Sequence, residues 1–209
     1  MRKIVCLIIA LAMILPAMAQ VSFGMRVGGA YSSLVQKIED ESESESRFGF
    51  SVAGLADIPL SKNKKWSLRP EVAFVNQGGA YYSDQDTEEP LFNKCWYYSL
   101  QVPVNVAYTF TFTDVRLSVF GGLAFDWALF GRMRSRESDK DLHFGVSEGK
   151  DLKTCDLGIS FGADIEYNRF FLALNAICGT INRRATKREG ETSVYQNNVT
   201  VSLGYYFRR

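Results

Sequence analysis

The chain has 209 residues, with 24 lysine and arginine residues against 23 aspartate and glutamate residues and a formal net charge of +1. A nucleic-acid-binding protein would show a clear basic excess, so this balance argues against that class of partner. Aromatic residues make up 13% of the chain and glycine occurs 17 times, a composition typical of β-rich proteins.

Residues 1–19 have the pattern of a secretory signal peptide. Arg2 and Lys3 precede an apolar run, and an Ala-x-Ala triplet at 17–19 closes the segment. The run is shorter than the roughly 20 residues that a spanning helix needs, and no later apolar run approaches that length. The sequence therefore predicts an exported protein without transmembrane helices, with residues 20–209 forming one domain.

Eight segments of the mature chain alternate apolar and polar residues with a period of two, which predicts β-strands with one apolar face. The clearest is DLGISFGADIEY, which sets Leu157, Ile159 and Phe161 against Asp156 and Ser160. The eight predicted strands cover residues 21–31, 48–58, 66–74, 96–108, 116–127, 156–167, 170–178 and 198–207.

The connections between these segments alternate in length, which places the long loops at one end of the structure and the tight turns at the other. The predicted long loops are 32–46, 79–94, 131–153 and 180–193, and the short ones are 59–65, 109–115 and 168–169. Outer-membrane barrels have this asymmetry, with short periplasmic turns and long extracellular loops. Nothing requires it in a soluble lipocalin-like barrel, which is the alternative from a different class.

Two patterns favour lipid, rather than a core, on the apolar side of the strands. Aromatic residues lie toward strand ends, where a membrane girdle would place them. The polar face carries charges of both signs deep inside strands, and in a narrow eight-stranded barrel such side chains fill the lumen. The predicted lumen network comprises Arg26, Arg69, Glu71, Arg116, Asp126, Asp164 and Glu166.

The segments FGMRVGGAYS, RPEVAFVNQGG, YYSLQVPVNVAYTF, LGISFGADIEY and VTVSLGYYF, with the signal peptide, resemble the PorT-type outer-membrane β-barrels common in Bacteroidetes. The resemblance covers nearly all of the mature chain and implies an outer-membrane barrel. The founder of the family is tied to protein secretion across the outer membrane. The closing strand also resembles the signal read by the barrel assembly machinery, with Phe207 as its aromatic residue.

No catalytic, cofactor or metal site is expected. The single histidine, His143, lies with Asp139 and Asp141 in a charged loop segment. A site needs converging ligands or an oriented nucleophile and base, and one histidine in such a loop supplies neither.

The loops carry clusters of charge that suggest binding to an anionic or cationic partner. The first loop is acidic, with Glu39, Asp40 and Glu45 among its residues. Arginine donates paired hydrogen bonds to phosphate, so basic clusters just outside a barrel suit lipopolysaccharide. The alternative is that these charges only keep the surface soluble. The candidate cations are Arg132, Arg134, Arg183, Arg184, Lys187 and Arg188.

Three cysteines remain in the mature chain, Cys95, Cys155 and Cys178. Since a two-residue turn at 168–169 pairs residues whose numbers sum to 337, Cys155 and Cys178 are not directly opposite. The sequence does not decide whether a disulfide joins them.

The sequence as a whole predicts an eight-stranded antiparallel up-and-down barrel in the outer membrane, with a plugged lumen and both termini in the periplasm. We expect a non-enzymatic structural or surface-recognition role through the extracellular loops, with membrane lipid and lipopolysaccharide as neighbours. A component of a secretion apparatus, interacting with other envelope proteins, is the nearest alternative, and a small-solute channel is disfavoured because the lumen is narrow.

Overall fold

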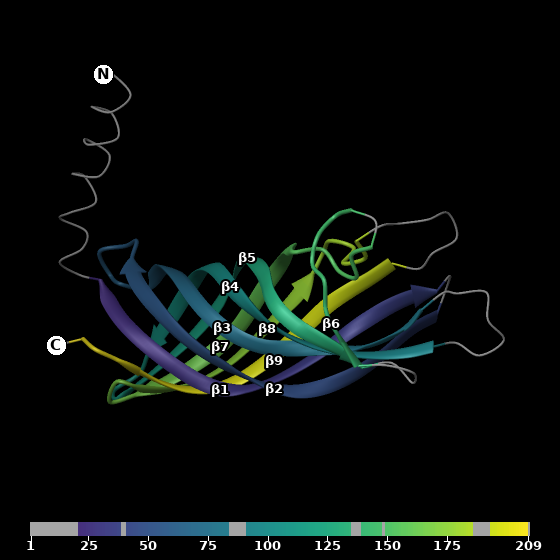
Figure 1. The fold of residues 1–209 in the computed structure, drawn as a ribbon. Coiled ribbons are helices and arrows are strands. Elements are labelled where there is room, and N and C mark those ends of the chain that lie inside the picture. The colour runs from purple at the N-terminus through teal and green to yellow at the C-terminus, as the bar shows by residue number, and fades with distance from the viewer. Residues whose placement is uncertain are drawn as a thin grey trace, which may run out of the picture.

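The computed structural model describes residues 21–38, 41–83, 91–134, 139–147, 149–185 and 193–208 (Figure 1). Within these ranges no helix is long and apolar enough to cross a membrane. The predicted signal peptide lies outside the described residues. The strands are β1 (Ser22–Ile38), β2 (Glu41–Pro59), β3 (Trp66–Ser83), β4 (Leu91–Thr111), β5 (Val115–Arg134), β6 (Asp139–Asp141), β7 (Cys155–Tyr167), β8 (Phe170–Gly179) and β9 (Ser193–Tyr206).

Eight of these strands form a closed antiparallel barrel. The short β6 pairs only with the last residues of β5. The hydrogen-bonded order is β4-β3-β2-β1-β9-β8-β7-β5, and pairing of β4 with β5 closes the ring. Every strand pairs with its neighbour in the chain except at the β1–β9 seam, where Gly24 lies opposite Tyr206. The predicted eight-stranded up-and-down barrel is confirmed. The beginning of β1 and the end of β9 lie side by side at one end of the barrel (Figure 1).

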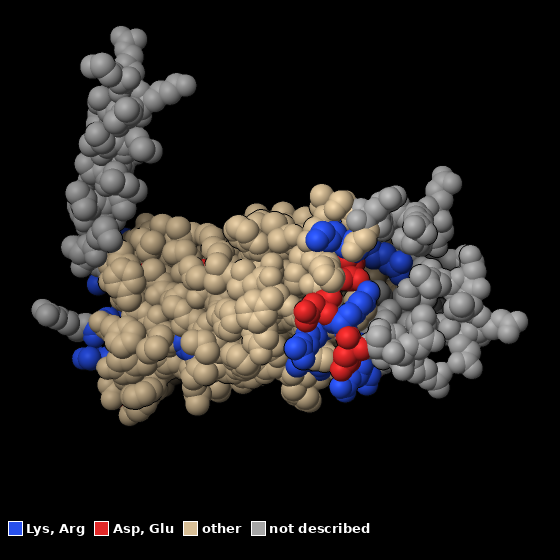
Figure 2. Space-filling model, in the orientation of Figure 1, with Lys and Arg blue, Asp and Glu red and all other residues tan. Residues whose placement is uncertain are grey.

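The apolar face of the strands points outward. In β7, Leu157, Ile159 and Phe161 are 41%, 52% and 50% exposed, whereas Asp156 and Ser160 on the other parity are 4% and 0% exposed. On the face seen in Figure 2, a wide belt with few charged side chains crosses the barrel, and charged residues gather at its ends. This is the arrangement of a barrel in lipid. The soluble-barrel alternative is wrong, because it requires an apolar interior.

Aromatic side chains on the outer face form contacts at two levels. Near the short turns, the ring of Tyr108 lies 4.9 Å from those of Trp66 and Phe110. Phe170 and Phe207 flank Tyr205 in the same way, at 5.0 and 5.5 Å. Toward the other end, a second group spans four strands and consists of Phe50, Phe74, Tyr98 and Phe130. We refer to it as the upper aromatic group.

The predicted long loops at 32–46 and 79–94 are largely strand, which corrects the sequence interpretation. β1 and β2 stay paired out to Ile38 and Glu41, and β3 and β4 out to Ser83 and Leu91. In these extensions apolar and polar residues no longer separate by face, since Ser32, Leu34 and Gln36 share one parity of β1 and are all buried. The period-two signal therefore disappears beyond the apolar belt. The barrel therefore projects well past its apolar belt at this end, which we call the outer end.

At the outer end the backbone of β3 lies against that of β1, although β2 separates them in the sheet. The Gly78 N–H donates to Ser32 Oγ at 3.0 Å. A Cβ on Gly79 would lie 2.4 Å from the backbone nitrogen of Leu34 and 2.9 Å from the Glu45 carbonyl oxygen. The β2–β3 register shifts between Glu45 and Ser51 at the same place. Glycine at position 79 is thus what allows the wall to fold inward here.

We predict that Gly79→Val lowers the free energy of unfolding by about 1–3 kcal/mol, because the added side chain forces β3 away from β1. Urea unfolding of the refolded barrel in lipid vesicles measures the loss. Gly54→Val is the matched control, since a Cβ there meets no heavy atom within 4 Å and faces outward. Equal losses in the two variants would contradict the role given to this contact.

Candidate functional site

The interior of the barrel is filled by layers of ion pairs, and the layer toward the short turns is built around Arg69. The Arg69 guanidinium, on β3, donates to Asp164 of β7 at 2.5 Å and to the Ser118 hydroxyl of β5 at 3.0 Å. Asp57 of β2 lies 3.5 Å from Arg69 Nε. These four residues form what we call the Arg69 cluster. Arg69 and its two carboxylate partners are at most 6% exposed, so the cluster joins non-adjacent strands across the lumen.

Two further arginine–glutamate pairs flank this cluster. Arg26 holds Glu71 through two hydrogen bonds, at 3.0 and 2.6 Å, and also donates to Ser202 at 2.9 Å. Arg116 lies 3.4 Å from Glu166. The paired, charge-assisted contacts between Arg26 and Glu71 are the strong form of hydrogen bond in proteins, whereas the single Arg116–Glu166 contact is long. They join β1 to β3 and β9, and β5 to β7.

The structure adds two residues to the predicted lumen network, Asp57 and Arg208. Arg208 follows the last strand, donates to Glu166, lies 4.0 Å from Asp57 and stacks 4.4 Å from the ring centre of Tyr206. The alternating pattern did mark Asp57 as facing inward, but it gave no partner. Nothing in the strand pattern indicated that a residue after β9 turns back into the barrel.

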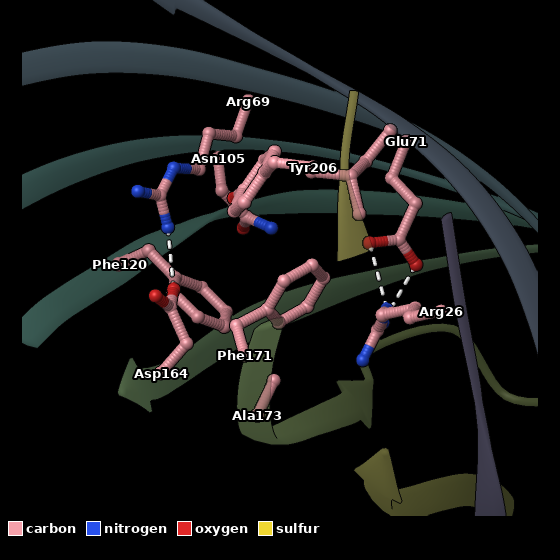
Figure 3. A pocket seen from close by; sticks show the side chains of 10 residues that line it. Arg26, Arg69, Glu71, Asn105, Phe120, Asp164, Phe171, Ala173 and Tyr206 are labelled. Atoms are coloured by element: carbon pink, nitrogen blue, oxygen red, sulfur yellow. Dashed lines mark hydrogen bonds and ion pairs between the residues drawn. The ribbon is translucent and has the colours of Figure 1, made fainter. Parts of the chain in front are cut away.

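Figure 3 shows how the Arg69–Asp164 and Arg26–Glu71 pairs lie around a small internal cavity, with Phe171 and Tyr206 between them. The cavity has a volume of about 30 Å³, which is close to the share of one water molecule. Phe171 and Tyr206 pack with Leu55 and Ala173 as an apolar layer inside the polar network. The lumen at this level is therefore closed to solutes.

Asp126 organises a second layer toward the outer end. Its Oδ2 accepts hydrogen bonds from Gln77 at 2.7 Å and from Ser99 and Gln101 at 2.9 Å each. The adjoining cavity measures about 10 Å³. Asp126 thus lies in the lumen among amides and a hydroxyl, while its arginine partner comes from a loop.

That partner is Arg183, and its position corrects its assignment as a lipopolysaccharide-contacting cation. Its side chain is 0% exposed, 3.7 Å from Asp126 Oδ1 and 5.4 Å from the centre of the Tyr97 ring. The Arg183 backbone N–H donates to the Val194 carbonyl at 2.7 Å, which folds the loop after β8 over the lumen. The carboxylate inside the barrel draws the guanidinium inward, so this residue cannot reach a lipid phosphate.

An apolar cluster closes the outer mouth above Arg183. The segment between β6 and β7 contributes Leu142 and Leu152, which pack on Tyr97, Leu34 and Val194 of the barrel wall. Phe144 adds an edge contact 5.6 Å from the Tyr97 ring. The loop is therefore part of the plug and not a freely solvated surface segment.

The other predicted loop cations differ in their surroundings. Arg132 and Arg134 are exposed and paired with Asp141 at 3.6 Å and Asp139 at 2.9 Å. The Arg134 hydrogen bonds lower the pKa of the Asp139 carboxyl from its ordinary value. Arg184 is half-buried. Lys187 and Arg188 lie outside the described residues.

The aspartates near His143 in the sequence do not gather around it. Asp139 and Asp141 pair with arginines, and Asp151 lies 3.6 Å from His143 Nδ1. Across the described ranges, no group of three or more histidine, cysteine, aspartate or glutamate side chains is arranged to hold a metal ion. The absence of catalysis stays a prediction.

Cys95, Cys155 and Cys178 are free thiols in the structure. The β7–β8 register follows the predicted sum, with Tyr167 opposite Phe170 and Ile159 opposite Cys178. Cys155 instead lies opposite Trp127. The question left open for Cys155 and Cys178 is therefore answered by register, which keeps them apart.

A family profile described as "Outer membrane protein beta-barrel domain" matches residues 17–179. Solved structures similar to this chain include the outer membrane protein OprG from Pseudomonas aeruginosa, at 11% identity and a TM-score of 0.49 over 90% of this chain and 96% of that chain. Neisserial surface protein A (NspA) shows 12% identity and a TM-score of 0.48 over 88% and 97% of the two chains. The attachment invasion locus protein Ail of Yersinia pestis shows 12% identity and a TM-score of 0.46 over 89% of this chain and 98% of that chain. A comparison with curated proteins gives no match.

We predict that Arg69→Met destabilises the barrel by about 3–5 kcal/mol, because it leaves buried carboxylates without their counter-charge. Urea unfolding in lipid vesicles measures this. Adding Asp164→Leu should recover part of the loss, giving a double-variant cost below the sum of the single costs. Arg116→Met is the control, since its side chain is 26% exposed and its contact is long, so it should lose less than about 1 kcal/mol. Strictly additive losses would contradict the coupling.

Proposed function

Because this chain belongs to the outer-membrane β-barrel protein family and resides in the bacterial outer membrane, we propose that it acts there without catalysing a reaction, as a structural or surface-recognition protein. The observation that carries the proposal is the filled lumen. The ion-pair layers around Arg69 and Asp126 and the apolar plug occupy successive levels of the barrel. A barrel closed in this way offers its surfaces, rather than a conduit, for function.

The outer end is the part of the surface best suited to recognition. The paired hairpins β1–β2 and β3–β4 continue past the apolar belt and carry charges of both signs, on Glu45, Arg47 and Lys94. Strand pairing and the packed segment between β6 and β7 hold these side chains on a rigid support. A pre-organised surface loses less conformational freedom on binding than a flexible loop does.

The closing strand supports insertion by the barrel assembly machinery as part of this proposal. Phe207 follows β9 directly, is 58% exposed on the outer face, and its N–H donates to the Phe23 carbonyl at 2.7 Å. This places an accessible aromatic residue at the β1–β9 seam, where the barrel closes.

A role in protein secretion rests on the resemblance to PorT-type barrels alone, because the family match is to outer-membrane barrels in general. It remains a sequence-based prediction, as does an origin in Bacteroidetes. Stable co-purification with other envelope proteins would favour this role over the one proposed.

A deletion strain separates the structural role from the recognition role. We expect loss of the gene to weaken the outer-membrane barrier to detergent or to reduce attachment of cells to surfaces. Complementation with Lys140→Ala/Lys150→Ala, which changes the exposed outer end, should restore the barrier but not attachment. Lys62→Ala/Lys65→Ala, at a short turn, is the matched control and should restore both. Deletion without either phenotype would contradict the proposal.

We also predict that the purified barrel gives no stable single-channel steps in planar lipid bilayers, because charged and apolar layers block the lumen. Liposome-swelling assays with small sugars should agree. A barrel of an open porin in the same bilayers verifies that conductance is detectable. Reproducible conductance from the wild-type chain would favour the channel alternative.

A further inference from the structure

The outer face of the barrel carries a groove at the outer end that the lumen network does not use. It has a volume of about 200 Å³ and is lined by residues of β2, β3, β4 and β5. Gly79 and Ala80 of β3 line it between the charged residues. The other lining residues include Arg47, Lys94 and Arg134, together with Trp96 and Glu45.

We propose that this groove binds a phosphate group of a phosphorylated glycolipid of the outer leaflet, that is, lipopolysaccharide. The proposal rests on the placement of the barrel in the outer membrane. Of the cations predicted from the sequence to contact lipopolysaccharide, Arg134 lines the groove and the buried Arg183 does not. Arg47 and Lys94, which were not among the predicted cations, line it as well.

The charges that line the groove favour an anion. Three cations and one carboxylate line the groove. Glu45 lies 3.1 Å from Lys94, and Asp139, which is not part of the lining, pairs with Arg134. Lys94 stands directly opposite Arg134 in the β4–β5 register, and like charges in such cross-strand positions repel one another. Glu45 and Asp139 offset part of this repulsion, and a phosphate between Lys94 and Arg134 would be attracted to both cations.

The arginines retain donors for such a ligand. Arg47 Nη1 donates to the Gln77 carbonyl at 3.2 Å, and Arg134 donates to Asp139 through Nε and Nη2. A guanidinium has five N–H donors, so in the described structure both side chains keep several for an incoming oxygen. Neither contact pulls the guanidinium away from the groove, since both residues line it.

The surroundings indicate a lipid rather than a free anion. Tyr98, Trp96 and Lys94 follow one another on the outer face of β4, so ring, indole and cation succeed each other toward the outer end over about 13 Å. Tyr98 belongs to the upper aromatic group, whose ring centres lie 4.9–6.4 Å apart in neighbouring pairs. A molecule with acyl chains against the rings and a phosphate above them matches both parts of this surface.

The test uses the full mature barrel refolded in phosphatidylcholine vesicles containing increasing amounts of lipopolysaccharide. The readout is the temperature at which the fast-running band of the unboiled sample in SDS converts to the unfolded band. We expect lipopolysaccharide to raise this temperature for the wild type and for Lys62→Gln/Lys65→Gln, which removes two cations at the opposite end. Arg47→Gln/Lys94→Gln should require at least about tenfold more lipopolysaccharide for the same shift.

A second variant moves the effect in the opposite direction. Glu45→Gln removes the carboxylate that competes for Lys94, so it should lower the lipopolysaccharide concentration needed for half of the shift. A variant that gains binding cannot do so through misfolding. The fast-running band in vesicles without lipopolysaccharide shows that each variant folds.

Two ligand controls identify the source of the phosphate. Enzymatically dephosphorylated lipopolysaccharide should give little shift, and inorganic phosphate at matched concentration should give none. The proposal is overturned if dephosphorylated lipopolysaccharide protects equally, if inorganic phosphate alone reproduces the effect, or if Arg47→Gln/Lys94→Gln binds as the wild type does. Because the readout is binding in vesicles, this outcome is independent of the phenotype of the deletion strain.

Discussion

The structure depends on the need to pair charges that a narrow barrel takes out of water. An isolated charge in such a setting is costly, and a pair repays its desolvation only when geometry and further hydrogen bonds are good. Arg69 meets this condition through Asp164, Asp57 and Ser118, which come from three different strands. The outer surface meets the opposite demand, since lipid excludes unpaired polar groups. Together these two demands require a sheet that is polar inside and apolar outside.

Filling the lumen with paired charges also determines what the protein can do. The contacts cross the barrel between strands that are not neighbours, so they hold the wall at a fixed separation. Beside the Arg69 cluster and Asp126 they leave cavities of only about 30 and 10 Å³, while a wider hollow of about 560 Å³ lies at the short-turn end. Arg183 and the segment around Leu142 and Leu152 extend the same principle to the outer mouth, where a loop becomes part of the interior. Function is thereby confined to the outer face and the outer end, where charges of both signs are displayed on paired strands.

Most of the fold could be predicted from the sequence because lipid and a polar lumen impose strict alternation. The parity of DLGISFGADIEY placed Ile159 outside and Asp164 inside, and the turn at 168–169 set the β7–β8 register correctly. The outer extensions of β1 to β4 could not be recognised in this way, because apolar and polar residues no longer separate by face there: Leu34 and Gln36 of β1 share one parity and are both buried. The alternating pattern also could not predict which inward-facing residues pair across the lumen, because the tilt of the strands decides which residues lie at the same height. The inward position of Arg183, which the sequence analysis placed among the lipopolysaccharide-contacting cations, and the contacts of Arg208 were not predicted for a related reason: both residues lie outside the alternating segments.

The contacts of Arg208 have a consequence for the order in which the barrel is assembled. Glu166 and Asp57 can pair with Arg208 only when the end of the chain has reached the barrel. Arg26 can donate its hydrogen bond to the Ser202 hydroxyl only when β9 has docked on β1. Until that moment the interior contains carboxylates and a guanidinium that are not fully paired. Intermediates that have entered the membrane without their last strand are therefore penalised electrostatically, so closure of the ring and completion of its interior are a single cooperative event.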